Sequence, residues 1–265
     1  MAITAAMVKE LRDNTGAGMM DCKKALNQAD GNMEKAIEEL RKSGIAKAEK
    51  KSGRATKEGR IITSIKEGKG AIVEVLCETD FVATNEKFTA FIKDIAEKAS
   101  EIDADGDVSE TLNANEKETL VNMISTIGEN MQLRRAKKWD TAGKVFSYLH
   151  MGGRIGVMVD VEGEADEAFL NDLCMHIAAF KPQYIAPEDV PADTIEKEKD
   201  IARAQMAGKP ENIIDNIIKG KINKWYSEIC LIRQPWIKDD KSCMEKIAPK
   251  ATVKRFIRWE VGEEL

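Results

Sequence analysis

The sequence has few of the residues on which metal centres depend. It contains two histidines and five cysteines in 265 residues, and neither a Cys-x-x-Cys pair nor a Cys/His cluster with zinc-site spacing occurs. Cysteines that are odd in number and scattered predict reduced thiols, as in cytoplasmic proteins. No apolar run approaches the ~20 residues of a membrane helix, and the N-terminus lacks the apolar core of a signal peptide. We therefore expect a cytoplasmic protein with no bound metal and no membrane contact.

The motifs of phosphate binding and covalent catalysis are also missing. No GxxxxGK[ST] loop is present, which excludes a Walker-type nucleotide site. Residues 152–156 superficially resemble a dinucleotide loop, but they lie between two expected strands and lack the GxGxxG spacing. There is no GxSxG, and the spacing of the abundant carboxylates indicates no acid–base pair. The sequence predicts a non-enzyme without a cofactor, with a hidden pair of carboxylates as the alternative.

Charge is plentiful but has no dominant sign. Charged residues make up 33% of the chain and the net charge is only -5, so both signs are interspersed over the surface. A dedicated nucleic-acid binder requires a basic excess, and we expect no direct contact with nucleic acid. Residues 1–60 carry thirteen Lys/Arg against nine Asp/Glu. This local excess fits an acidic partner or an ordinary solvated helical surface, and it leaves weak RNA binding by the basic linker as an alternative.

Residues 1–45 predict a small module of three helices. Thr4 and Asn32 can each cap a helix, because their side-chain oxygens accept hydrogen bonds from the free N–H groups at a helix start. Each helix is expected to end at a glycine-containing turn, and these turns are residues 14–18, 30–31 and 43–44. Residues 46–58 contain almost no large apolar side chain and predict an exposed helix and linker.

A degenerate repeat organises the rest of the chain. Two β-rich runs joined by a glycine-containing turn occur twice, and each pair precedes a helical pattern and a third expected strand that ends at a tryptophan. The paired runs are 59–65 with 143–149, 70–75 with 153–159, and 134–139 with 254–259. We predict an α+β fold with two related subdomains, at residues 59–140 and 141–265, each an antiparallel sheet with helices on one face. A chance likeness of secondary structure is the alternative to duplication.

The second subdomain carries an insertion at about residues 190–229. Pro191 fits the start of a polar helix that runs to about Ala207, and residues 208–210 break it. A second helix follows, with isoleucines and Trp225 at helical spacing. Two helices joined by a tight turn predict an antiparallel hairpin. Its apolar stripe packs either within the hairpin or against a second copy of the protein.

Residues 78–85 place an acid, an aromatic ring and a β-branched residue on a strand-to-helix connection. Taken alone, this loop has a structural interpretation. Thr79 or Asp80 caps the next helix, and Phe81 packs beneath it.

Several separate motifs resemble the elongation factor Ts family. They are Leu11-Arg12, the run from Thr15 to Leu26, Thr79-Asp80-Phe81-Val82, His150 through Val157, Met175 through Ala179, and Gln234-Pro235 before Trp236. Because these motifs follow one another in order over essentially the whole chain, the resemblance is more specific than any one of them.

The resemblance implies a guanine-nucleotide exchange factor that binds elongation factor Tu, a translational GTPase, and promotes release of its GDP. It implies that the N-terminal module is a ubiquitin-associated-like bundle that grips the partner's nucleotide-binding domain. It also implies that the helical hairpin can support a homodimer, as in some members. The residues that match the family's contact with the nucleotide-binding domain are Arg12, Met19, Met20 and Lys23. Those that match the family's magnesium-displacing loop are Thr79, Asp80, Phe81 and Val82. Those placed near the partner's far domain are His150, Gly153 and Arg154.

Two departures and two alternatives accompany the resemblance. Some members continue into a further helix after the last expected strand, which ends at about Val261 here, and Trp236 stands where the family more often has Phe. We expect the tryptophan to be a packing variation. The alternative for Met19 and Met20 is packing inside the small bundle. The alternative function is a scaffold whose bundle binds a peptide or a ubiquitin-like protein without affecting nucleotide.

Overall fold

The computed structural model describes residues 2–204 and 211–265 of the chain. Three helices form the N-terminal module, as predicted, and their bounds are α1 Ala5–Thr15, α2 Met19–Gln28 and α3 Met33–Lys51. The side chains of Thr4 and Asn32 cap α1 and α3 by accepting backbone hydrogen bonds. The buried residues between the helices form a core of their own, which consists of Val8, Leu11, Cys22, Ala25, Leu26, Ala29 and Ala36.

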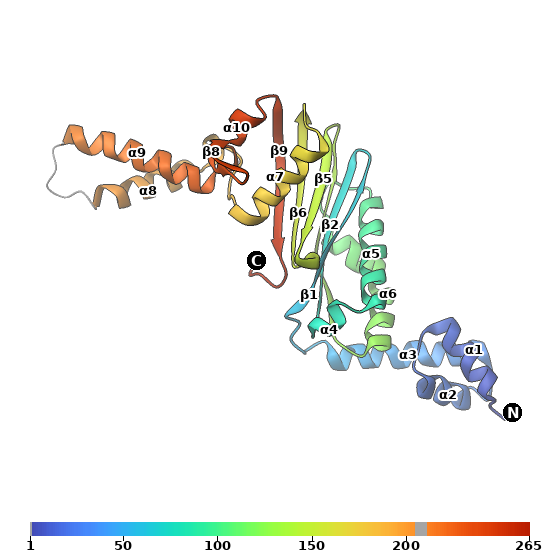
Figure 1. Cartoon of the computed structure of the whole chain (residues 1–265). Coiled ribbons are helices and arrows are strands. Elements are labelled where there is room, and N and C mark those ends of the chain that lie inside the picture. Colours follow the sequence, from blue (N-terminus) through green and yellow to red (C-terminus); the bar gives the residue numbers. More distant parts are fainter. Residues whose placement is uncertain (1, 205–210) are drawn as a thin grey trace.

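Helix α3 does not end near Gly44, as the sequence predicted, but continues to Lys51. Gly44 is buried against α6 (Ser109–Ile127), where an added Cβ would lie 3.6 Å from the Cβ of Ser125. A glycine inside a helix costs about 1 kcal/mol in propensity, but packing against a neighbouring helix overrides such a preference. The first half of the expected linker is therefore helical, and one unbroken helix joins the module to the rest of the molecule (Figure 1). The proposed domain limits stay a prediction.

Two antiparallel sheets form the centre of the molecule. The first has the strand order β1-β2-β4-β3 and the second the order β5-β6-β9. Their bounds are β1 Glu58–Lys66, β2 Lys69–Cys77, β3 Gly106–Asp107, β4 Met131–Asp140, β5 Lys144–His150, β6 Ile155–Gly163 and β9 Ala251–Glu260. In each sheet the middle strand pairs with its hairpin partner and with the later strand, which confirms the predicted α+β fold of two antiparallel sheets.

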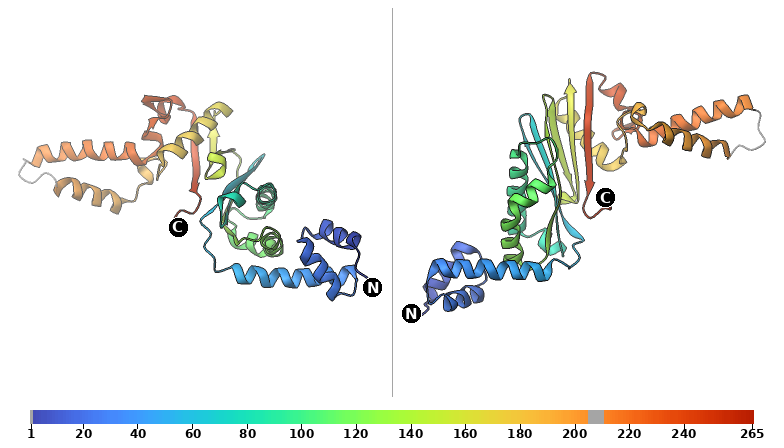
Figure 2. Two further views of the ribbon diagram at one scale, coloured as in Figure 1. Left: turned by 60° about the horizontal axis from the view of Figure 1, so that its bottom comes forward. Right: turned by 180° about the vertical axis from the view of Figure 1, so that it is seen from behind.

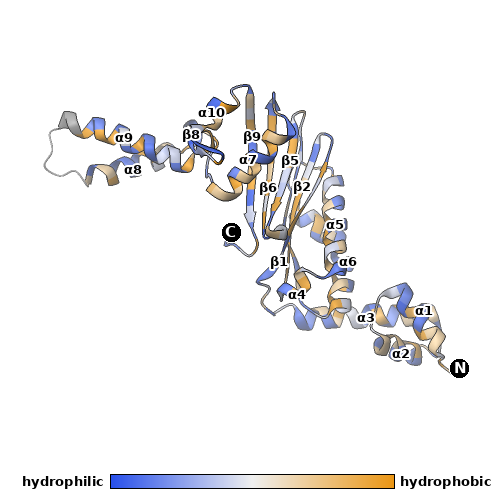
Figure 3. Ribbon diagram, viewed as in Figure 1, coloured by the Kyte–Doolittle hydropathy of each residue, from blue (hydrophilic) through white to orange (hydrophobic). Residues whose placement is uncertain are grey.

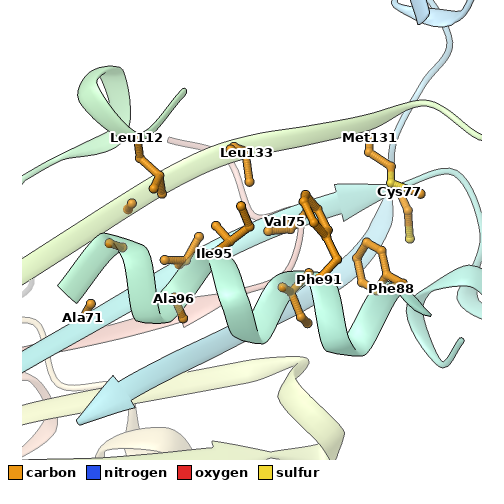
Figure 4. Packing of buried hydrophobic residues seen from close by; sticks show 14 of the residues in the cluster. Ala71, Val75, Cys77, Phe88, Phe91, Ile95, Ala96, Leu112, Met131 and Leu133 are labelled. Atoms are coloured by element: carbon orange, nitrogen blue, oxygen red, sulfur yellow. The ribbon is translucent and has the colours of Figure 1, made fainter. Parts of the chain in front are cut away.

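The sheets and helices stack in four layers. Helices α5 (Glu86–Glu101) and α6 cover the outer face of the first sheet, and α7 (Glu167–Phe180) covers the outer face of the second (Figures 1 and 2). The inner faces pack on each other through residues that include Ile61, Trp139 and Trp259. Apolar segments accordingly gather on the strands of both sheets (Figure 3). The apolar side chains of α5, such as Phe88 and Ile95, point into the core under the first sheet (Figure 4).

The two sheets repeat each other in fine detail. Each middle strand has a β-bulge at a buried acid, Glu74 in the first sheet and Asp160 in the second. In each sheet the tryptophan of the last strand pairs with a glycine of the middle strand, and these pairs are Gly70 with Trp139 and Gly156 with Trp259. An equivalent bulge, acid, glycine and tryptophan support duplication over chance likeness.

Helices α8 (Ala192–Ala204) and α9 (Glu211–Ile229) form the predicted antiparallel hairpin, which projects from the second sheet at the end opposite the N-terminal module (Figures 1 and 2). The apolar stripe of α9 packs within the hairpin, where Ala202, Ile218 and Ile222 are buried together. The predicted helix end at Ala207 and the break at residues 208–210 lie outside the described residues. A homodimer through the hairpin stays a prediction.

Shorter elements complete the second subdomain. They are the turns η1 Met151–Gly153, η2 Pro187–Asp189 and η3 Leu231–Arg233, the strands β7 Pro235–Trp236 and β8 Asp239–Cys243, and the helix α10 Met244–Ile247. Trp236 is buried and stacks on Phe169 and His176, so it is a packing residue, as expected. All five cysteines are free thiols. Across the described ranges, no helix combines the length and the apolar character needed to span a bilayer.

Candidate functional site: an exposed aromatic tip and two flanking surfaces

The loop after β2 forms a one-turn helix, α4 (Asp80–Ala83), that presents Phe81 outward. Thr79 caps this turn, since its hydroxyl oxygen accepts a hydrogen bond from the Val82 N–H at 3.3 Å. Val82 and Ala83 face the core under the first sheet, whereas 83% of Phe81 is exposed. The predicted cap is confirmed at Thr79. The structural interpretation, in which Phe81 packs beneath the helix, is wrong.

A carboxylate from a distant part of the chain holds this loop. One oxygen of Glu129 accepts the backbone N–H groups of Glu78 and Thr79, both at 3.1 Å, and its other oxygen accepts the Thr79 hydroxyl at 2.7 Å. Glu78 in turn accepts the backbone N–H of Asn130 at 2.6 Å. The side chain of Asn130 donates to the carbonyl oxygen of Arg54 at 2.8 Å, which ties the segment after α3 to the same network.

Sequence reasoning missed Glu129 because it missed helix α6, which ends immediately before it. The signal for this helix was present but weak. Leu112, Leu120 and Ile124 recur at multiples of four residues, and Gly128 ends the helix with φ 92°. Many of the positions between them are polar, so no strong apolar stripe stands out.

The N-terminal module exposes all four residues that were predicted to contact a partner. Met19 is 55% exposed and Met20 75%, so the alternative that they pack inside the bundle is wrong. Arg12 and Lys23 are exposed as well. Met20 and Lys23 line a shallow depression on α2, and the first turn of this helix starts at Met19.

The third predicted group lies at the turn between β5 and β6. His150 is exposed, with Nδ1 3.0 Å from the Tyr148 hydroxyl, and Arg154 is exposed beside Glu58 at 2.7 Å. Gly153 is buried at φ 95°, where a Cβ would lie 2.6 Å from the carbonyl oxygen of Ile61. Glycine at this position lets the turn close against β1, so Gly153 shapes the turn and presents no surface of its own.

The structure brings two of these three groups to the same end of the sheets. Arg154 pairs with Glu58, and Glu58 lies opposite Cys77, the residue that ends β2 just before the loop. The N-terminal module stands apart, beyond the far end of α3 (Figures 1 and 2). Sequence reasoning did not single out Met151, which has φ 49° and is 68% exposed at the tip of this turn.

The buried thiol of Cys77 lies beneath the loop. Burial raises the pKa of the Cys77 thiol to about 12, which keeps it protonated and unreactive, and its S–H donates to the Thr79 carbonyl oxygen. Within residues 2–204 and 211–265, no group of three or more His, Cys, Asp or Glu side chains is placed to hold a metal ion. The loop itself offers an exposed ring beside a carboxylate, Asp80, whose oxygen accepts the Phe81 N–H at 2.9 Å.

Comparison with known proteins assigns a family to this arrangement. Residues 78–263 match the family model described as Elongation factor TS. An elongation factor Ts of Clostridium botulinum (strain Alaska E43 / Type E3) is 49% identical over 98% of this chain and 93% of the relative. Those of Clostridium perfringens (strain 13 / Type A) and Trichlorobacter lovleyi are 45% and 44% identical, over 98% and 100% of this chain and 93% and 94% of the relatives.

Proposed function

The chain belongs to the elongation factor Ts family, and from this premise we propose that it is the guanine-nucleotide exchange factor of elongation factor Tu. Family membership supports a role in nucleotide exchange during translation elongation. In the proposed reaction the protein binds elongation factor Tu with GDP, disturbs the Mg²⁺ and phosphate site of this partner, and thereby promotes GDP release so that GTP can bind. The observation that carries the proposal is Phe81, 83% exposed on a capped turn.

Burial of the exposed ring in the partner can supply free energy for nucleotide release. A GTPase of this kind holds GDP through backbone amides, a lysine and a Mg²⁺ ion that bridges phosphate oxygens. A ring that inserts between elements of the partner gains about 2–3 kcal/mol when it is buried there, and this gain can offset a shift of the elements that hold the metal. Asp80 brings a negative charge beside the ring and perturbs the polar contacts that orient the metal ligands.

The module and the loop divide the work in this proposal. Arg12, Met19, Met20 and Lys23 provide affinity for the partner, while the loop acts on the nucleotide site. Linkage makes the effect reciprocal, because a factor that weakens GDP binding is itself weakened by GDP to the same extent. A coupling of about 4 kcal/mol changes affinity about a thousandfold. No covalent bond is made or broken in this protein's part of the reaction.

The experiment measures release of a fluorescent GDP from purified elongation factor Tu by stopped flow. We expect Phe81→Ala to lower the maximal release rate at saturating factor by about 30- to 150-fold, because ~2–3 kcal/mol of ring burial is lost. The double change Met19→Ala and Met20→Ala should instead raise the half-saturating concentration and leave the maximal rate nearly unchanged. Circular dichroism melts of each variant control for folding.

Three results contradict the proposal. If the unmodified protein binds elongation factor Tu without speeding release, it acts as a scaffold. If Phe81→Ala releases GDP at the unmodified rate, the ring has no part in displacement. If the methionine double variant unfolds the N-terminal module, its weaker binding reflects the lost fold and not lost contacts with the partner.

A further inference from the structure

The position of Phe81 depends on its backbone and not on contacts of its ring. With 83% of the side chain exposed, the ring gains almost no packing within its own chain. Helix α4 is four residues long, and a single turn of helix is not stable by itself in water. Something outside the turn must therefore fix the direction in which the ring points.

Glu129 meets this requirement through three hydrogen bonds. It accepts the backbone N–H groups of Glu78 and Thr79 and the Thr79 hydroxyl, the same group whose oxygen caps α4. An ionised carboxylate suits this task because it is acceptor-only, with two oxygens for several donors, and such charge-assisted bonds are stronger than neutral ones. Glu129 is half-buried, and all the hydrogen bonds that its carboxylate makes in the described chain go to the loop. The Lys51 ammonium is a further electrostatic neighbour of this carboxylate.

Glu129 is flanked on both sides by hydrogen-bonded residues. Gly128, at φ 92°, ends α6 by donating its N–H to the Ile124 carbonyl oxygen at 2.9 Å, and Glu129 follows directly. On the other side Asn130 is buried and bonded through its backbone N–H to Glu78. The carboxylate is thus held between a helix end and the start of β4, two elements of the first subdomain.

We propose that Glu129 is a positioning residue for exchange: it holds the α4 turn so that the Phe81 ring meets the partner GTPase already oriented. This inference rests on the proposed function. A preorganised ring does not have to be ordered during binding, and the free energy of its insertion is then available for displacing the nucleotide. Glu129 acts through Phe81 and does not itself touch the partner.

The test is a double-mutant cycle with Glu129→Gln and Phe81→Ala, read out as stopped-flow release of fluorescent GDP from elongation factor Tu. Glutamine keeps the shape but replaces one acceptor oxygen by a donor. We expect Glu129→Gln to lower the maximal release rate about tenfold, and to change the half-saturating concentration by less than about twofold. In the Phe81→Ala background the same change should have no further effect.

Two variants sharpen the result. Glu110→Gln makes the same charge change at an exposed position in the first turn of α6 and should release GDP at the unmodified rate. Thr79→Val removes one of the three donors to Glu129 together with the cap of α4, with little change of shape. If Glu129→Gln proves too unstable to assay, Thr79→Val takes its place and should also lower the maximal rate. Melting curves identify a variant that has lost its fold.

The outcomes separate this inference from the proposed function. If the unmodified protein does not accelerate release, the proposed function fails. If it does and Glu129→Gln is equally fast, the positioning role fails. Additive losses in the double mutant also overturn it, because Glu129 then acts independently of the ring.

Discussion

At the scale of single residues, His176 shows how a polar side chain is kept in a core. It is fully buried between the rings of Phe180 and Trp236, with centroid distances of 4.7 and 5.1 Å. Its Nε2 lies 2.9 Å from Oε1 of Gln234, whose amide nitrogen donates to two carbonyl oxygens. Oε1 is therefore the acceptor and Nε2 carries the proton. Nδ1 is buried without a hydrogen-bond partner in the described chain.

This burial predicts a loss of stability at acid pH. Desolvation lowers the pKa of His176 in the folded state below its ordinary value of 6.5. The unfolded chain then binds more protons than the folded one between these two pKa values, so the free energy of unfolding falls as pH drops below about 6.5, by up to ~1.4 kcal/mol per pH unit. Urea unfolding at pH 7.5 and pH 5 measures this change in the free energy of unfolding.

A non-titrating substitution separates His176 from the other groups that titrate in this range. His176→Gln should show a smaller loss between the two pH values than the unmodified protein. The exposed His150 provides the matched control, and His150→Gln should keep the original loss. An equal loss in all three proteins would show that His176 does not cause the dependence.

At the scale of elements, the sequence predicted what short-range patterns encode. The hairpins followed from β-rich runs around glycine turns, and the caps at Thr4 and Asn32 from their side-chain oxygens. The end of α3 and the existence of α6 could not be predicted in the same way, because each depends on the other. Gly44 looks like a helix end until α6 is known to pack on it.

In the candidate site, too, the features encoded by nearby residues could be predicted, and those that depend on a distant segment could not. The family resemblance pointed to Thr79, Phe81 and the module residues. Phe81 and the module residues are exposed, whereas Thr79 is half-buried, and their contact roles stay a prediction. It did not locate Glu129, whose hydrogen bonds to the loop form only where the end of α6 meets it. The local pattern alone could not decide the exposure of Phe81, since a capped turn is compatible with a ring that is buried or free; only the resemblance implied a ring that faces a partner.

The packing of α3 on α6 predicts the effect of substitutions at Gly44. An added Cβ would lie at ordinary van der Waals distance from Ser125, and Ala has the better helix propensity. Gly44→Ala should therefore stabilise the protein by about 0.5–1 kcal/mol and raise the melting temperature by about 1–4 °C. Differential scanning calorimetry measures this shift.

A larger side chain at the same position tests whether the two helices are in contact. Gly44→Leu should lower stability by about 1–3 kcal/mol, because its side chain forces α3 away from α6. If Gly44→Leu were as stable as Gly44→Ala, the glycine would lie on an open helix face and the close packing would be wrong.

At the scale of the whole molecule, the two sheets are joined by reciprocal contacts, in which an arginine of each sheet lies over a tryptophan of the other. The Arg135 guanidinium of the first sheet lies over the Trp259 ring of the second at 4.3 Å, and that of Arg255 lies over Trp139 at 4.7 Å. Each arginine also donates to a backbone carbonyl oxygen of the opposite last strand. This exchange is what a duplicated unit produces when its two copies pack face to face, and it links the two sheets around the core that lies between them.

The two arginines nevertheless differ in how many hydrogen-bond and ion-pair partners the buried acid beside each of them keeps when the arginine is removed. Glu74, the buried acid beside Arg135, also pairs with Arg134 and accepts the Gly262 N–H. Asp160, the acid beside Arg255, keeps only the Thr141 hydroxyl among its described partners. An unpaired buried carboxylate is costly, whereas one that retains its other donors is much less so.

This asymmetry predicts unequal losses from equivalent changes. Arg255→Met should lower the free energy of unfolding by about 3–5 kcal/mol, because Asp160 loses its cation, and Arg135→Met by only about 1–2 kcal/mol. Lys254→Met provides the control on the same strand, since Lys254 and Glu162 are each about half exposed and such pairs contribute less than ~1 kcal/mol. Urea unfolding measures all three. Equal losses for the two arginines would mean that the stacking on tryptophan, which both share, decides stability, and that the buried acids do not.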